Sequence, residues 1–176
     1  ERIVGDIVYL GHTRVVLRSD NEPALVLLVS DALRGLRIQH LESAAAEGSV
    51  QYDPQTAGAA EVAVRNLKAQ VRAMHLTLDR FLEKHVPVKH PLISWLVEYA
   101  AFVRLTGVIG RDGKIAYNRI RGRNHTLRLP FFGERVRYKC RAQEGGIDGE
   151  GVRWDDGIYI GVHRRSNQYL VYDAAR

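Results

Sequence analysis

The chain has 176 residues, of which 45% are hydrophobic and 26% charged, and these ordinary globular values exclude disorder and a fibrous repeat. A single Cys excludes a disulfide scaffold and a four-cysteine zinc site. The longest apolar stretch, Ala24–Val29, is far too short for a membrane span, and we expect neither a membrane partner nor a secretory leader. The net charge of +6 favours a polyanion as partner.

The positive charge is concentrated in one segment. From Gly107 to Ala142 the chain has ten basic residues against the two acids Asp112 and Glu134, so this segment carries +8 and the rest of the chain −2. Such a shift in composition marks a domain boundary or a binding surface. A solvated basic face without a ligand is the alternative interpretation.

The first third of the chain is predicted to alternate between helices and short strands. Helical periodicity and turn residues predict a helix that ends near Leu10, a buried strand over 13–18, a helix over 24–36 and a short strand over 37–41. Residues 42–56 are polar and contain Gly48 and Pro54, a composition typical of a mobile loop.

Two longer helices are predicted next. Apolar residues at helical spacing predict a helix from Ala57 to Lys84 and a second, mostly apolar helix over Leu92–Leu105. Met74, Trp95 and Phe102 fall on the apolar faces of these helices, so we expect them in the core.

After Pro130 the pattern changes to short strands. They are predicted over Arg135–Cys140, Gly157–Val162 and Gln168–Tyr172, with a glycine-rich loop between the first two. We expect Trp154 in the core of this module. Four tyrosines of the module either stack on bases or only fill the strands: Tyr138, Tyr159, Tyr169 and Tyr172. The whole pattern predicts an α/β domain followed by a small β-barrel.

Two acids are singled out by their positions. Asp20 follows the first predicted strand, at the end where open α/β sheets place functional side chains, and Glu61 lies in the first turns of the long helix. Two such carboxylates can share a divalent metal ion, which prefers hard oxygen ligands. The alternatives are structural, because Ser19 and Glu22 match a capping box and Glu61 near a helix N-terminus suits the macrodipole.

A row of basic residues follows Glu61 along the same helix. Arg65, Lys68 and Arg72 lie four, seven and eleven positions after it, so all four side chains share one face, opposite the apolar stripe. This face suits a phosphate backbone. An ordinary Glu61–Arg65 pair on a solvated surface is the alternative.

Six segments resemble, in order along the chain, the integrase region of copia-type retrotransposon Pol polyproteins. Arg18–Ala24 resembles the motif of the second catalytic aspartate, and Gly58–Glu61 resembles the glutamate motif. The other four segments are His90–Leu96, Asp112–Gly122, Phe131–Val136 and Trp154–Gly161. The resemblance covers essentially the whole chain.

The resemblance implies the C-terminal part of an α/β RNase H-like integrase core, with its early strands missing, followed by a small all-β barrel module. In this family two aspartates and a glutamate hold two Mg²⁺ or Mn²⁺ ions, which activate the attacking oxygen and stabilise the leaving oxygen during phosphodiester transesterification. By the resemblance, Asp20 and Glu61 are catalytic metal ligands. Arg65 and Lys68 match positions that retroviral relatives place against the DNA end.

The sequence also departs from the family pattern. The first aspartate would lie upstream of the first predicted helix, and the preceding His/Cys zinc module is missing, so we expect no zinc in this chain. Ala57 and Val62 replace the usual Asn and Arg of the glutamate motif. We therefore expect that the chain alone does not join DNA strands. The alternative function is a non-catalytic, domesticated or degenerate DNA-binding remnant, and an unrelated α/β hydrolase or nuclease is a third possibility.

The domain organisation implied by the resemblance has three parts. Residues 1–106 would belong to the integrase core, 107–130 to a basic connector and 131–176 to the β-barrel. The connector contributes the DNA-binding candidates Arg119, Arg121 and Arg123. The expected partners are element and target DNA and, in the full integrase, further copies of the chain. The family would act in the nucleus after a stage in a cytoplasmic particle.

Overall fold

The chain forms two compact units, residues 1–64 and residues 65–176. The computed structural model describes residues 2–19, 21–35, 42–48, 54–139 and 154–173 of them. The long helix α3, Pro54–Leu82, begins in the first unit and ends in the second. No described helix is long and apolar enough to span a membrane.

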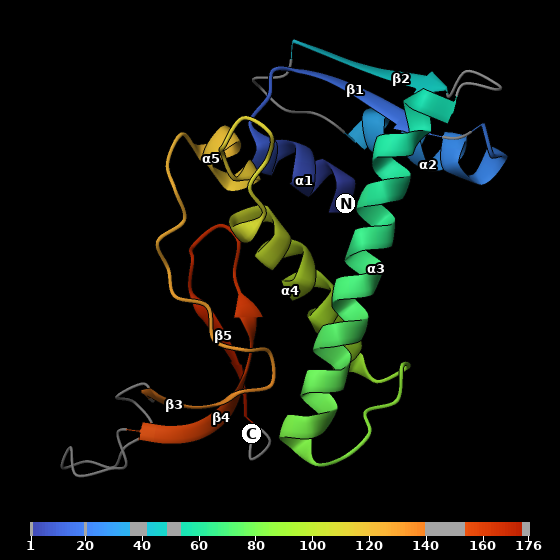
Figure 1. The fold of residues 1–176 in the computed structure, drawn as a ribbon. Coiled ribbons are helices and arrows are strands. Elements are labelled where there is room, and N and C mark those ends of the chain that lie inside the picture. Colours follow the sequence, from blue (N-terminus) through green and yellow to red (C-terminus); the bar gives the residue numbers. More distant parts are fainter. Residues whose placement is uncertain (1, 20, 36–41, 49–53, 140–153, 174–176) are drawn as a thin grey trace. The chain divides into compact units, whose positions relative to one another are not determined.

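The first unit contains a two-stranded parallel sheet. Its elements are α1 (Arg2–Leu10), β1 (Arg14–Ser19), α2 (Pro23–Gly35) and β2 (Ser43–Gly48), as Figure 1 shows. β1 pairs with β2 in parallel, from Arg14 opposite Ser43 to Ser19 opposite Gly48. Parallel strands need a crossover connection, and α2, which packs against both strands, provides it.

Local sequence signals set the ends of the helices in this unit. Gly11, at φ +72°, follows α1 and donates its N–H to the carbonyl of Ile7 at 3.2 Å, a typical helix stop. Pro23 stands at the first position of α2, where its missing N–H costs nothing. Ile7 of α1 and Val29 of α2 are buried.

Two expectations for this unit were wrong. β1 is not a buried strand, because Val16 is 61% exposed and only alternate residues are half-buried. The expected loop over 42–56 contains β2 and the start of α3. The Ala-rich segment of β2 has low strand propensity, and its pairing with β1 overrides that preference. The strand expected over 37–41 lies outside the described residues.

The second unit contains the rest of α3, two further helices and a sheet. α4 runs over Pro91–Gly107 and α5 over Ala116–Arg121. His90 caps α4, because its Nδ1 accepts a hydrogen bond from the N–H of Leu92 at 3.2 Å, and Pro91 follows at the first helical position. α5 was not predicted, because one and a half turns are too short for a periodic pattern.

Three antiparallel strands complete this unit. β3 (Arg135–Lys139), β4 (Trp154–Val162) and β5 (Tyr169–Tyr172) lie in the order β3–β4–β5. The register between β4 and β5 shifts between Tyr159 and Gly161. Within the described residues this is an open three-stranded sheet, where a small barrel was expected. The RNase H-like fold stays a prediction, because mixed α/β elements with small sheets occur in many folds.

The core of the second unit lies between the helices and the sheet. Its buried residues are Leu78, Val86, Leu96, Tyr99, Phe102, Phe132, Tyr159, Ile160 and Val162. Tyr99 of α4 meets the ring edge of Tyr159 at a centroid distance of 5.4 Å, and its hydroxyl donates to the carbonyl of Pro130 at 2.6 Å. These contacts attach α4 to β4 and to the segment before β3.

The expectations for large side chains had mixed outcomes. Phe102 is buried and Met74 packs against the core, as predicted. Trp95 is 42% exposed, so its place in the core was wrongly predicted. Trp154 is 52% exposed and is therefore not a core residue either.

The predicted domain boundary after residue 106 falls inside the second unit. α4 and α5 lie on either side of it and pack against each other. The division into residues 1–106, 107–130 and 131–176 therefore stays a prediction.

Candidate nucleic-acid interface

The two units differ strongly in charge. Residues 1–64 contain five basic and nine acidic residues, a formal charge of −4. Residues 65–176 contain 21 basic and 11 acidic residues, a formal charge of +10. The positive charge of the chain is therefore concentrated in the second unit.

Part of this charge lies along α3. Arg65, Lys68 and Arg72 are exposed, and no acid of the described chain forms an ion pair with any of them. The Glu61–Arg65 pair that was the alternative interpretation is not formed. Val71 and Leu78, on the opposite side of the helix, pack in or against the core. The basic row thus faces solvent, where a phosphate backbone can reach it.

Arg119, a DNA-binding candidate, instead holds a turn together. Its guanidinium donates to both carboxylate oxygens of Asp112, with Nε at 2.9 Å from Oδ2, and to the carbonyl of Lys114 at 3.2 Å. The Asp112 carboxylate also accepts the N–H of Lys114. The hydrogen bonds from Arg119 hold the pKa of Asp112 well below its usual range. The chain turns at Arg111-Asp112-Gly113, with Gly113 at φ +73°.

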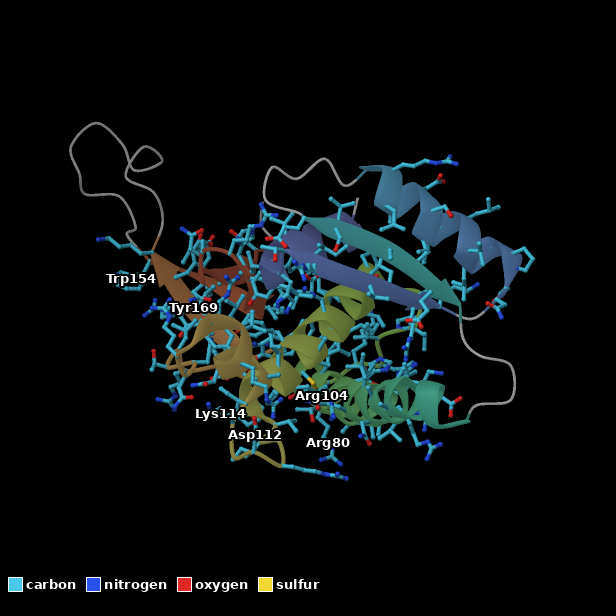
Figure 2. The ribbon with its side chains drawn as sticks, turned by 90° about the horizontal axis from the view of Figure 1, so that it is seen from above. Arg80, Arg104, Asp112, Lys114, Trp154 and Tyr169 are labelled. Atoms are coloured by element: carbon cyan, nitrogen blue, oxygen red, sulfur yellow. The ribbon has the colours of Figure 1, made fainter. Side chains whose placement is uncertain are left out.

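The other two candidates of the connector are exposed. Arg121 is the last residue of α5 and already has an interaction partner within the protein. Arg123 follows Gly122, which ends α5 at φ +68°, and the described chain offers it no acidic partner. Lys114 lies beside Asp112 on the preceding turn (Figure 2). Arg123 and Lys114 therefore remain available to a ligand.

A second basic row follows the outer face of β3. Alternate residues of this strand, Arg135, Arg137 and Lys139, are exposed, while those between them are half-buried. Arg137 lies opposite Asp156 of β4, with Nε 3.3 Å from Oδ1. Lys139 pairs with Trp154 across the two strands. Trp154 is exposed at the start of β4 and is labelled in Figure 2. A cation beside an exposed indole is an arrangement that suits nucleic acid.

The tyrosines of the module are mostly engaged within the protein. Tyr159 is 1% exposed, so stacking of a base on it is excluded. The hydroxyl of Tyr169 donates to the carbonyl of Arg128 at 2.6 Å, and that of Tyr138 donates to Asp173 at 2.7 Å. Tyr169 and Tyr172 are both 47% exposed.

Asp20 lies outside the described residues. It directly follows β1 in the sequence, and the described Asn21 beside it lies so close to Gly48 that a Cβ at residue 48 would collide with it. The capping-box alternative for this segment was wrong, because α2 begins at Pro23 and Ser19 belongs to β1.

Glu61 lies seven positions beyond Pro54, the first residue of α3. The helix macrodipole acts mainly on the first turn, so it does not explain this glutamate. The side chain is exposed and has no ion pair within the described chain. Because the position of Asp20 is not described, the shared metal site of Asp20 and Glu61 stays a prediction.

One cluster that the sequence analysis did not find joins the end of α3 to the following turn. His85 Nδ1 lies 2.8 Å from Asp79 Oδ2, and Asp79 Oδ1 accepts the N–H of Val86 at 2.9 Å. His75 Nε2 lies 3.7 Å from Asp79 Oδ1 and 2.7 Å from the carbonyl oxygen of Val86. The hydrogen bonds from Val86 and His85 lower the pKa of Asp79. The four-residue spacing of His75 and Asp79 on one helix face was the signal available in the sequence.

No protein-family model matches the chain, and no curated protein matches it.

Proposed function

We propose that this chain is the DNA-binding, C-terminal part of a retroelement integrase of the copia type. The observation that carries the DNA-binding part is the +10 charge of residues 65–176, much of it on exposed side chains that have no acidic partner in the described chain. The row Arg65, Lys68 and Arg72 supports contact with a phosphate backbone, and Arg123 with Lys114 adds to it. The bound class is DNA, from the element end or the target.

The integrase part of the proposal rests on the order of elements and on the resemblance. The elements follow the order that the family's second aspartate and glutamate require. Asp20 comes directly after β1, the crossover helix α2 and the parallel strand β2 follow, and α3 contains Glu61. Two Mg²⁺ or Mn²⁺ ions would be held by these carboxylates together with a further aspartate. Their chemistry would be the activation of a water or a 3′-hydroxyl for attack on a phosphodiester.

The first test measures DNA binding as a function of salt. The affinity of the full chain for a short duplex is expected to fall steeply with salt, because each phosphate contact contributes about −0.9 to the slope of log K against log salt. The double variant Arg65→Ala, Lys68→Ala is expected to bind more weakly at low salt and to show a slope shallower by about 2.

A matched control removes the same charge from the first unit. Arg14 and Arg18 are exposed and each pairs with a glutamate at 2.9 Å, Glu42 and Glu47 respectively. The variant Arg14→Ala, Arg18→Ala is expected to leave the slope unchanged. Equal losses in both double variants would mean that only net charge matters, and a salt-independent affinity would contradict the proposal.

The second test concerns strand joining. In a protein that contains this chain together with the remaining core, Asp20→Asn or Glu61→Gln is expected to abolish Mg²⁺-dependent joining while DNA binding and folding persist. Preserved joining in either variant would refute the assigned metal ligands. If the parent protein binds DNA but does not join strands, the result would instead support the alternative of a non-catalytic remnant. The departures from the family pattern at Ala57 and Val62 favour that alternative.

A further inference from the structure

The side chains of His75, Asp79 and His85 form a compact set of possible metal ligands. One ligand atom from each residue lies within 4.8 Å of the other two. All three residues belong to the second unit, and two of them stand one turn apart on α3. We infer that this cluster is a binding site for a divalent transition-metal ion of the Zn²⁺ class, independent of the proposed DNA-joining function.

The spacing of the ligand atoms fits a tetrahedral ion. Bonds of about 2.0–2.1 Å to nitrogen and oxygen place neighbouring ligands of a tetrahedral zinc roughly 3.3 Å apart. His85 Nδ1 lies 2.8 Å from Asp79 Oδ2, and His75 Nε2 lies 3.7 Å from the other carboxylate oxygen, Oδ1, so both imidazoles stand near this separation from the carboxylate. Side-chain rotations would bring the three ligand atoms to one ion.

The chemistry of the donors selects the class of metal. Two imidazoles and one carboxylate form a ligand set found in zinc proteins, with water in the fourth position. Imidazole nitrogen suits Zn²⁺ and its neighbours, whereas Mg²⁺ prefers six oxygen ligands. The site is therefore expected to discriminate against the ion that the integrase chemistry uses.

Burial and hydrogen bonding position the ligands. The side chains of His75 and Asp79 are 19% and 22% exposed, while that of His85 is 72% exposed, so an ion can enter from the solvent side. Asp79 keeps its bond from the N–H of Val86 through Oδ1, and Oδ2, which lies 2.8 Å from His85 Nδ1 in the metal-free protein, is the oxygen that would ligate the ion. Such outer bonds fix the orientation of ligating carboxylates.

Binding costs two hydrogen bonds of the metal-free protein. His85 Nδ1 donates to Asp79 Oδ2 at 2.8 Å, and this bond is lost when the two atoms ligate the ion. His75 Nε2 lies 2.7 Å from the carbonyl oxygen of Val86, so in the metal-free protein this nitrogen carries a proton and donates it. To ligate the ion, Nε2 gives up this hydrogen bond, and the ring proton resides on Nδ1. Zn²⁺ binding is therefore expected to weaken as the pH falls, since protons compete for the imidazoles.

The experiment titrates Zn²⁺ into the full chain by calorimetry, with Co²⁺ as a spectroscopic probe of tetrahedral geometry. The chain carries no affinity tag, has been treated with chelator, and contains Cys140→Ser so that its single thiol adds no ligand. One Zn²⁺ per chain is expected, with a rise in Tm on binding. Mg²⁺ at the same concentration is expected to give neither effect.

Variants identify the ligands. His85→Ala removes an exposed ligand without disturbing the core and is expected to weaken Zn²⁺ binding at least tenfold with an unchanged circular dichroism spectrum. Asp79→Asn keeps an oxygen for the N–H of Val86 and is expected to lose affinity similarly. His12→Ala, at an exposed histidine of the first unit, is the control. Absence of Zn²⁺ binding, equal affinity in His85→Ala, or a preference for Mg²⁺ would overturn the inference, and none of these results would affect the DNA-binding proposal.

Discussion

Gly133 lies in the turn Phe131–Glu134, immediately before β3. Within the turn, Phe131 N–H donates to the Glu134 carboxylate at 2.8 Å, and Glu134 N–H donates to the Phe131 carbonyl at 3.0 Å. Two further hydrogen bonds join the turn to β4: Gly133 N–H donates to the Tyr159 carbonyl, and Tyr159 N–H donates to the Glu134 carbonyl, both at 2.9 Å. The residue has φ +88°, and a Cβ here would overlap the side chain of the fully buried Leu78. Backbone conformation and packing thus both require glycine.

Two glycine-to-alanine variants distinguish the cost of the positive φ from the cost of overpacking. Gly133→Ala is expected to cost about 1–2 kcal/mol for the positive φ and roughly 1–3 kcal/mol more for overpacking against Leu78. Gly113→Ala, at φ +73° with open space around it, is the matched variant and is expected to show only the first cost. Urea unfolding of both variants measures the difference, and equal losses would show that Leu78 yields without cost.

His125 is enclosed by aromatic rings. The rings of Phe102 and Tyr117 lie at centroid distances of 5.4 and 5.1 Å from the imidazole, and each ring plane is nearly perpendicular to it. Its Nε2 is buried and has no hydrogen-bond partner within the described chain. Burial lowers the pKa of His125 from its ordinary value of 6.5, so the folded protein holds the ring neutral.

This histidine makes stability depend on pH. Because the unfolded chain takes up the proton first, the contribution of His125 is complete above about pH 6.5 and is lost as the pH falls toward and below its lower folded pKa. His125→Phe keeps an aromatic ring and cannot be protonated. Its Tm is expected to decrease less than that of the parent between pH 7 and pH 5, measured by thermal unfolding. Parallel Tm curves would contradict this origin of the pH dependence.

At the scale of elements, the long helices were predicted most accurately. In α3 and α4 the apolar residues recur at helical spacing over several turns, so the positions of both helices follow from local sequence. β2 and α5 were missed for two different reasons. β2 exists because β1 pairs with it along its whole length, which is a non-local cause, and α5 is too short to show a period.

Side-chain burial was less predictable than the elements. Trp95 and Trp154 were placed in the core because large aromatic residues are usually buried, yet both are exposed. In each case the position of the side chain depends on which face of the element packs on the core. For α4 the buried face is the one that contains Leu96 and Tyr99, and it is set by the contact with β4.

The candidate site was also only partly predictable. The exposure of Arg65, Lys68 and Arg72 follows from the helical period, and the structure agrees with it. The engagement of Arg119 with Asp112 depends on a turn geometry that brings residues seven positions apart together. The spacing of His75 and Asp79 is visible in the sequence, but the place of His85 beside them depends on the return of the chain after α3, which no helical pattern encodes.

At the scale of the whole molecule, charge separates along the chain. The first unit carries −4 and the second +10, so bound DNA is expected to protect amides of the second unit from hydrogen exchange. Protection should be strongest around α3 beyond Arg65, α5 and β3, with little change in β1 and α2. Mass spectrometry of the full chain with and without a duplex measures this. Protection confined to residues 1–64 would contradict the proposed interface.

The bond between Arg119 and Asp112 has a consequence for the thermodynamics of binding. Binding of DNA releases counterions, and the entropy of this release favours the complex. Arg119 contributes little to it, because Asp112 already neutralises most of its charge. The guanidinium of Arg119 instead stabilises the turn that contains Asp112 and Lys114, so this turn is ordered before any ligand binds. The loop that presents Lys114 therefore meets its ligand already rigid, and the loss of conformational freedom on binding is correspondingly smaller.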